Sequence, residues 1–185
     1  MYYLTENNIL LSYADNKYDD NCKYTDIITQ AELDEDKQKV IVVNNELELN
    51  PDYEAEKLAE AKQNKYQEAN LGAVEYLEGG NALYAFEQSG NTYHIEATDG
   101  NIAKIGLKAT SLLIQQDYTT TFPWNTKEDI NIQLNAFEGK AIAEGLGAIQ
   151  DEVWTVKFPE YIDEIEQAQT VEEVEAIVID YESEE

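Results

Sequence analysis

The stretch from Val40 to Pro51 constrains the fold of this chain more than any other segment. Its first ten residues, VIVVNNELEL, form two β-rich runs that meet at Asn44–Asn45. Because asparagine tolerates the positive φ angles of a tight primed turn, this stretch predicts a β-hairpin. Asn50 and Pro51 follow at once, and asparagine as N-cap with proline in the first helical position predicts a helix start. The chain is therefore expected to change from strands to a helix at this junction.

The residues before the junction predict a small β-rich N-terminal module, residues 1–50. Tyr2–Leu4 and Ile9–Tyr13 have the composition of strands, and Glu6-Asn7-Asn8 between them predicts a hairpin turn. A third apolar run, Tyr24–Ile28, follows a polar loop.

Residues 51–78 predict a helix that connects this module to the rest of the chain. Three acidic residues lie in its first turns, where they complement the positive end of the helix dipole, and Gly79–Gly80 ends it. Its N-terminal half is polar nearly all round, which is typical of a helix that bridges two modules. We therefore place a domain boundary within residues 51–65.

The remaining sequence predicts an α+β domain, residues 79–181, and a short acidic tail, residues 182–185. Two short hairpins and three to four helices are expected in this domain. The hairpins are Leu83–Glu87 with Thr92–Glu96, and Phe122–Asn125 with Ile130–Leu134. The predicted fold class of the chain is thus α+β: a β-rich module, a connecting helix and an α+β domain.

The helices of this domain are expected to begin at N-cap residues or at proline: Thr98, Asn135, Pro159 and Thr170. The second of them is expected to reach about Phe158, with interruptions at Gly145 and Gly147. Gly145-Leu146-Gly147 resembles part of a dinucleotide-binding motif, but no strand precedes it, so close packing or a kink explains these glycines better. A short extended segment, Val178–Tyr181, is expected to follow the last helix.

The charge of the chain limits its partners. It has no arginine, and 12 lysines stand against 39 acidic residues, which gives a net charge of −27. Arginine is the side chain best suited to bidentate phosphate contacts, and phosphate binding in general needs cations. We therefore expect no direct binding to nucleic acid and none to an anionic membrane. The last 26 residues carry 11 of the acids and no base.

The sequence also indicates a cellular location. No apolar run approaches the about 20 residues of a membrane span, and the first residues lack the features of a signal peptide. The single cysteine, Cys22, cannot form an internal disulfide, which fits a reducing compartment. We therefore expect a protein of the cytoplasm.

Few residues offer chemistry. His94 is the only histidine and has no cysteine or second histidine with which to share a metal. Cys22 lies near Lys23 but has no partner histidine. The acidic loop around Asp19 gathers oxygen atoms, but Lys17 occupies a ligand position and the glycine of a calcium loop is missing. We therefore expect no catalytic, cofactor-binding or metal-binding residues, and no enzyme.

Four aromatic residues are the candidate partner-binding residues: Trp124, Trp154, Phe158 and Tyr161. They lie at element edges or at spacings compatible with one helix face. Two interpretations remain open at this point, which are packing in the core and an exposed patch for a protein partner.

Three motifs in the C-terminal half carry a resemblance. They are WNTK at residues 124–127, Gln150-Asp151-x-x-Trp154, and the run from Tyr161-Ile162-x-x-Ile165 through AQTVEEVE to Ile177. Together with a β-rich leader that runs through VIVVNNELELNPDYE into a helix, they resemble an uncharacterised phage domain family. That family occurs in proteins encoded next to tail-fibre genes and identified as tail-fibre assembly proteins. The similarity covers most of the chain, and the family pattern contains no catalytic residues.

The resemblance implies a non-enzymatic phage or prophage tail protein. It implies a tail-fibre or other tail protein as the partner, and a role either as an assembly chaperone or as an accessory that stays on the fibre. Its location would be the bacterial host cytoplasm during phage assembly, or the virion itself. We hypothesise that an open edge of residues 1–50 complements the β-structure of such a partner. The sequence leaves the oligomeric state open.

Two other classes of function compete with this one. The first is an acidic anti-defence inhibitor that mimics nucleic acid and blocks a host nuclease, with the carboxylates of the C-terminal helices in place of phosphates. The second is a hydrolase that uses paired carboxylates, but in so acidic a chain the abundance of such pairs carries no signal.

Overall fold

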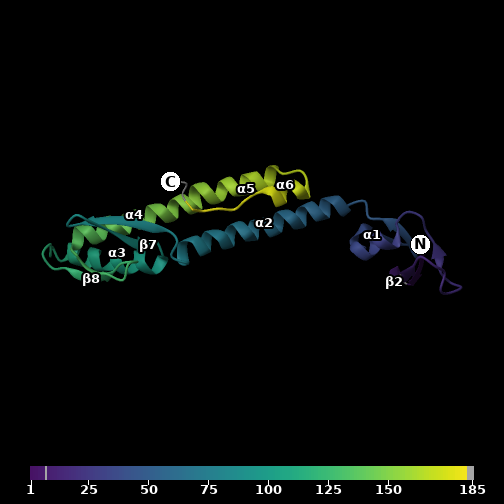
Figure 1. Ribbon diagram of the computed structural model, residues 1–185, viewed down its shortest axis with the longest axis horizontal. Coiled ribbons are helices and arrows are strands. Elements are labelled where there is room, and N and C mark those ends of the chain that lie inside the picture. Colours follow the sequence, from purple (N-terminus) through teal and green to yellow (C-terminus); the bar gives the residue numbers. More distant parts are fainter. Residues whose placement is uncertain (7, 183–185) are drawn as a thin grey trace. The chain divides into compact units, whose positions relative to one another are not determined.

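The computed structural model of the protein describes residues 1–6 and 8–182 (Figure 1). Helices make up 49% of the chain and strands 23%, and the strands form small antiparallel sheets. The α+β class expected from the sequence is therefore confirmed. The chain divides into two compact units, unit 1 (Met1–Glu60) and unit 2 (Ala61–Glu185). The division falls inside one helix, α2 (Tyr53–Glu78).

Unit 1 contains a three-stranded sheet in the order β2-β1-β3, a separate hairpin of β4 and β5, and two short helices. Its elements are β1 (Tyr2–Glu6), β2 (Ile9–Ala14), β3 (Lys23–Tyr24), α1 (Gln30–Glu35), the 3-10 helix η1 (Lys37–Lys39), β4 (Val40–Val43) and β5 (Glu46–Leu49). The predicted hairpin at VIVVNNELEL is confirmed as β4–β5, with Asn44 and Asn45 at φ angles of 52° and 60°.

The expected turn at residues 6–8 joins β1 to β2, although Asn7 itself lies outside the described residues. Asn8 has a φ angle of 60°. Of the third apolar run, only Tyr24 belongs to a strand, whereas Ile28 turns into the core of unit 1. That core consists of Met1, Tyr3, Ile28, Leu33 and Leu47.

Helix α2 begins at Tyr53, two residues later than expected. The side-chain oxygen of Asn50 accepts a hydrogen bond from the backbone N–H of Asp52, so Pro51 and Asp52 form a turn before the helix. In unit 1, the ammonium of Lys57 on α2 forms an ion pair with Oδ2 of Asp36 at 2.9 Å. The helix ends at Glu78, and Gly80 follows with a φ angle of 81°, which glycine adopts without steric cost.

Unit 2 combines two hairpins with helices. Its elements after α2 are β6 (Leu83–Gln88), β7 (Asn91–Glu96), α3 (Asp99–Ile114), β8 (Phe122–Asn125), β9 (Asn131–Leu134), α4 (Ala136–Glu152), the π-helical segment η2 (Val153–Lys157), α5 (Phe158–Gln167) and α6 (Val171–Ala176). Both expected hairpins are confirmed, as β6–β7 and β8–β9. Figure 1 shows α5 and α6 beside the part of α2 that belongs to unit 2, where Lys65 donates to the carbonyl of Ile177.

Helices α3 and α4 pack closely and run antiparallel. The side chain of Gln150, near the end of α4, donates to Asp99 at the start of α3 at 2.9 Å. At the other end of the pair, a Cβ added at Gly139 would lie 3.1 Å from the Cβ of Ala109. Small residues at this interface therefore allow the two backbones to approach each other.

The interruptions expected at Gly145 and Gly147, in the helix that begins after Asn135, are wrong. Gly145 and Gly147 lie within α4, and the helix continues through η2 into α5 without a separate start at Pro159. Proline lacks an N–H and its ring collides with the carbonyl four residues earlier in a regular α-helix. Here the turn is widened, because the N–H of Phe158 bonds to the carbonyl of Val153, five residues before it.

The last residues of unit 2 complete its core. Val178–Tyr181 runs without regular secondary structure, and the buried ring of Tyr181 joins the apolar cluster of the unit. Other buried members of this cluster are Leu77, Ile95, Ile105, Leu134, Ile142, Leu146 and Val153. Of the expected acidic tail, residues 183–185 lie outside the described residues. No helix in the described part of the chain has the length and apolar character needed to cross a membrane.

Candidate functional site

Three of the four candidate aromatic residues lie on one continuous helix of unit 2. Trp154 belongs to η2, and its ring meets that of Phe158 edge-on at a centroid distance of 5.5 Å. Tyr161 on α5 packs edge-on against Tyr181 at 5.3 Å. Phe158 and Tyr161 are half-buried against the core of unit 2, whereas 37% of Trp154 is exposed. Their role in partner binding stays a prediction.

Trp124 lies apart from these three, on β8. Its ring is half-buried against the core, and the ammonium of Lys108 lies 6.0 Å from the ring centroid. Among the described residues, its indole Nε1 is buried without a hydrogen-bond partner. Trp124 therefore contributes mainly to packing between β8 and α3.

The only histidine makes a structural contact. His94 Nδ1 lies 2.6 Å from Glu128 Oε1, and the backbone N–H of His94 donates to Glu128 Oε2 at 3.2 Å. The contact with His94, followed by that with Thr126, lowers the pKa of Glu128 to about 2. Next to it, Lys127 pairs with Glu96 at 2.7 Å. These contacts tie β7 to the turn between β8 and β9.

The remaining candidates for chemistry lie apart. Cys22 is a free, half-buried cysteine in unit 1. Across residues 1–6 and 8–182, no group of three or more histidine, cysteine, aspartate or glutamate residues is arranged to hold a metal ion.

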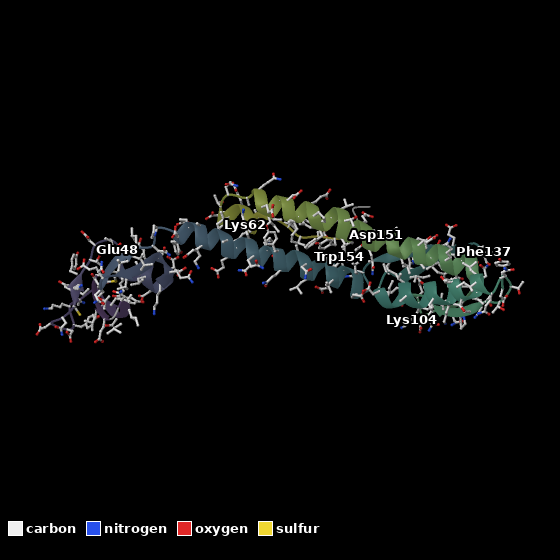
Figure 2. All side chains as sticks on the ribbon, turned by 180° about the vertical axis from the view of Figure 1, so that it is seen from behind. Glu48, Lys62, Lys104, Phe137, Asp151 and Trp154 are labelled. Carbon is white, nitrogen blue, oxygen red and sulfur yellow. The ribbon has the colours of Figure 1, made fainter. Side chains whose placement is uncertain are left out.

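A surface centred on α3 is the most distinctive exposed feature of unit 2. We define the α3 surface as the exposed residues Ala103, Lys104, Leu107, Lys108, Ser111 and Ile114 of α3. Leu107 and Ile114 are 73% and 77% exposed, although apolar side chains of this size are usually buried. Beyond the end of α3, the exposed rings of Tyr118 and Phe137 stack on each other at a centroid distance of 5.4 Å. Lys104 and Phe137 can be located on unit 2 in Figure 2.

The α3 surface differs in charge from the rest of the chain. Residues 100–116 form the longest stretch without an acidic residue and contain two lysines, in a protein with a net charge of −27. Neither Lys104 nor Lys108 forms an ion pair within the described part of the chain. The ammonium of Lys108 lies over the ring of Phe122, 5.4 Å from the ring centroid. The surface is thus apolar and locally cationic.

A shallow groove of about 380 Å³ runs along this surface. Leu107, Lys108, Ser111 and Leu112 line one side of it, and residues 120–122 line the other. The second wall is held by the carboxylate of Asp117 at the end of α3.

Asp117 Oδ1 accepts hydrogen bonds from the backbone N–H groups of Thr119 and Thr120, at 3.2 and 3.0 Å. Bonds from the side chain and backbone of Thr120, followed by those from Thr119, lower the pKa of Asp117 to about 2. The carboxylate is therefore charged at neutral pH and fixes the wall of the groove.

Sequence reasoning missed the α3 surface because it considered aromatic residues and total charge. The signal was nevertheless present in the sequence, as a helical stretch in which no acid interrupts residues 100–116. Exposed positions of a helix in so acidic a protein would ordinarily include carboxylates. A long acid-free helical stretch in a chain of this composition therefore indicates a distinct surface.

Comparison of this chain with models of protein families, with curated proteins and with solved structures finds no match.

Proposed function

We propose that this protein is a non-enzymatic phage or prophage tail protein, either a tail-fibre assembly chaperone or a fibre accessory, and that it binds another tail protein through the α3 surface. The observation that carries this proposal is the exposure of Leu107 and Ile114 on an acid-free helix face. The resemblance of the C-terminal motifs to the phage domain family supports the choice of partner. Binding would take place in the host cytoplasm during assembly, or persist in the virion.

The physical basis of binding is burial of apolar surface. Removing apolar area from water is favourable by about 25 cal/mol per Å², so exposed Leu107 and Ile114 represent a driving force that a partner can use. Elsewhere the acidic surface opposes non-specific association with other acidic molecules. A protein of this kind would bind through one surface and stay soluble through the others.

The test is co-expression with a phage tail-fibre protein, followed by size-exclusion chromatography. The double variant Leu107→Asp, Ile114→Asp is expected to lose co-elution. The matched control is Leu71→Asp, which changes a leucine that is 66% exposed on α2. Retained co-elution of the double variant would exclude the α3 surface as the binding site, and absence of any complex with the parent chain would contradict the proposed function.

A second candidate function, inhibition of a host nuclease by nucleic-acid mimicry, is favoured by the exposed carboxylates of α5 and α6. They are Glu160, Asp163, Glu164, Glu166, Glu172, Glu173 and Glu175, and within the described residues none of them forms an ion pair. Nuclease inhibition that disappears with added salt, and that is weakened by Asp163→Asn with Glu164→Gln, would favour this function. If this chain acts only as a tail-fibre assembly chaperone or fibre accessory, we expect it to leave nuclease activity unchanged.

A further inference from the structure

We infer that the α3 surface takes a partner helix whose apolar side chains are flanked by carboxylates. This inference rests on the proposed function, because it names the chemistry of the segment that the tail partner would present. Its basis is the arrangement of two rows of side chains along α3.

The first row is apolar and uncharged. Leu107 and Ile114 are seven residues apart, which places them on the same face of the helix about 10 Å from each other. Ser111 lies between them and is small, so it leaves room for a side chain of the partner. Apolar residues at positions i and i+7 of an amphipathic helix match this spacing.

The second row is cationic. Lys104 and Lys108 are four residues apart, and both are exposed. Lys108 and Leu107 of the apolar row line the same groove, and the ammonium of Lys108 lies over the ring of Phe122 at the opposite wall. Because neither lysine has a carboxylate partner in the described part of the chain, a carboxylate beside the partner's apolar side chains would complete the pairing.

A second copy of this chain does not match the surface. In a two-fold symmetric dimer through α3, each copy would present the same acid-free stretch, residues 100–116, so the α3 of the other copy would offer Lys104 and Lys108 no carboxylate. Two chains with a net charge of −27 would also repel each other. The charge pattern therefore favours a different protein, which need not be acidic as a whole.

The experiment uses two synthetic helical peptides as probes. Both carry leucines at positions i, i+4 and i+7, and their flanking positions are glutamate in one peptide and lysine in the other. Each is titrated into the full-length protein, and backbone amide shifts are followed by NMR. We expect the glutamate peptide to shift amides of α3 and residues 118–122. The lysine peptide is expected to shift amides of the acidic helices instead.

Variants locate the two parts of the interaction. Leu107→Asp with Ile114→Asp is expected to abolish the shifts on α3. Lys104→Gln and Lys108→Gln are each expected to weaken binding of the glutamate peptide by about threefold, the usual size of an exposed ion pair. Lys140→Gln is the control, because Lys140 is an exposed lysine on α4 that already pairs with Glu144 at 3.4 Å. The Trp emission of each variant checks that unit 2 is folded.

Two results would overturn the inference: stronger shifts on α3 with the lysine peptide, or unchanged binding of the glutamate peptide after both lysine substitutions. The two proposals can fail separately. If the tail protein binds the parent chain but is insensitive to the lysine substitutions, the inference fails and the proposed function stands. If the glutamate peptide binds as expected but no tail protein does, the proposed function fails and the inference stands.

Discussion

Asn8 and Asn45 hydrogen-bond to each other reciprocally. The backbone N–H of Asn8 donates to Oδ1 of Asn45 at 2.8 Å, and the backbone N–H of Asn45 donates to Oδ1 of Asn8 at 2.9 Å. Both residues have a φ angle of 60°, in the left-handed region. Lys23 adds a bond from its ammonium to the carbonyl of Asn45 at 2.7 Å. The pair therefore joins the β1–β2 turn to the β4–β5 turn and couples the two sheets of unit 1.

Replacement of Asn45 by alanine tests this coupling. Asn45→Ala removes one of the two side-chain acceptors and places an alanine at positive φ, so we expect the stability of unit 1 to fall by about 2 kcal/mol. Both tryptophans lie in unit 2, so tryptophan emission does not report on unit 1. Hydrogen–deuterium exchange of residues 1–50 is the appropriate measurement.

Asn45→Gly separates the two causes. Glycine adopts the positive φ angle freely but lacks the side-chain acceptor, so its effect is expected to be about 1 kcal/mol, smaller than that of alanine. Equal exchange rates in the two variants would contradict a contribution from the backbone conformation. Unchanged exchange in both would contradict the coupling itself.

Gly145 and Gly147 provide a matched pair of substitutions on α4. A Cβ added at Gly145 would collide with the ring of Tyr84, whereas one added at Gly147 would meet nothing within 4 Å. Gly145→Ala is therefore expected to lower the free energy of unfolding by about 1–3 kcal/mol, because the ring of Tyr84 or the helix must move. Gly147→Ala is expected to raise it by up to about 1 kcal/mol through helix propensity. Tryptophan emission during urea unfolding measures both.

The decisive result is whether the free energy of unfolding falls in Gly145→Ala and rises in Gly147→Ala. If Gly145→Ala stabilised unit 2 as much as Gly147→Ala, then the close contact between α4 and Tyr84 would not exist in solution. If both destabilised it equally, glycine would be required at both positions for a reason other than packing.

The elements that the sequence predicts correctly are those with local causes. The hairpin at Val40–Leu49 follows from its paired asparagines, and the helix after Thr98 follows from an N-cap whose side chain accepts from the N–H of Asn101 at 3.1 Å. The start of α4 at Asn135 has the same origin, since its side chain accepts from two backbone N–H groups. Such signals involve residues a few positions apart, so they can be recognised without knowing the fold.

The features that the sequence does not reveal depend on distant contacts. Gly145 and Gly147 are indistinguishable in the sequence, and only the position of Tyr84 on β6 separates them. The widened turn at η2 keeps the helix continuous where Pro159 predicts a new start. Similarly, the spacing of the candidate aromatics does not reveal that Phe158 is half-buried, whereas the acid-free stretch of α3 is visible in the sequence itself.

The contact between His94 and Glu128 predicts a dependence of stability on acid pH. The pKa of Glu128 lies at about 2, below its usual 4.5, because the charged carboxylate is hydrogen-bonded in the folded protein. Its contribution to stability is therefore present above pH 4.5 and is lost as the pH falls from 4.5 towards 2. Glu128→Gln is expected to be less stable than the parent at neutral pH, and the difference is expected to shrink across this range.

Urea unfolding of unit 2 at a series of pH values, followed by tryptophan emission, measures this difference. Glu144→Gln, which changes an exposed carboxylate on α4, controls for the general loss of negative charge. A stability difference between the parent and Glu128→Gln that stays constant from about pH 6 to about pH 2.5 would show that the folded structure does not lower the pKa of Glu128.

Tyr181 makes the corresponding prediction at alkaline pH. Its side chain is 3% exposed, and its hydroxyl donates to the carbonyl of Ala69 on α2 at 2.9 Å. Burial, with a smaller contribution from Tyr161, raises the pKa of Tyr181 to about 12 from its usual 10.0. Because the folded state holds this proton more tightly than the unfolded state, the contribution of Tyr181 is present below pH 10 and is lost as the pH rises from 10 to 12.

Tyr181→Phe keeps the ring in the core and removes the hydroxyl. At neutral pH we expect the variant to be less stable by about 1 kcal/mol, since the hydrogen bond from the hydroxyl to the carbonyl of Ala69 is lost. Between pH 10 and 12 its stability is expected to decline less steeply than that of the parent, because one titrating group is missing. Tyr118→Phe, at a 51% exposed position, is the control and is expected to follow the parent. If Tyr181→Phe and the parent declined in parallel, the ring of Tyr181 would have to be accessible to solvent, and the C-terminal segment would not be held against α2.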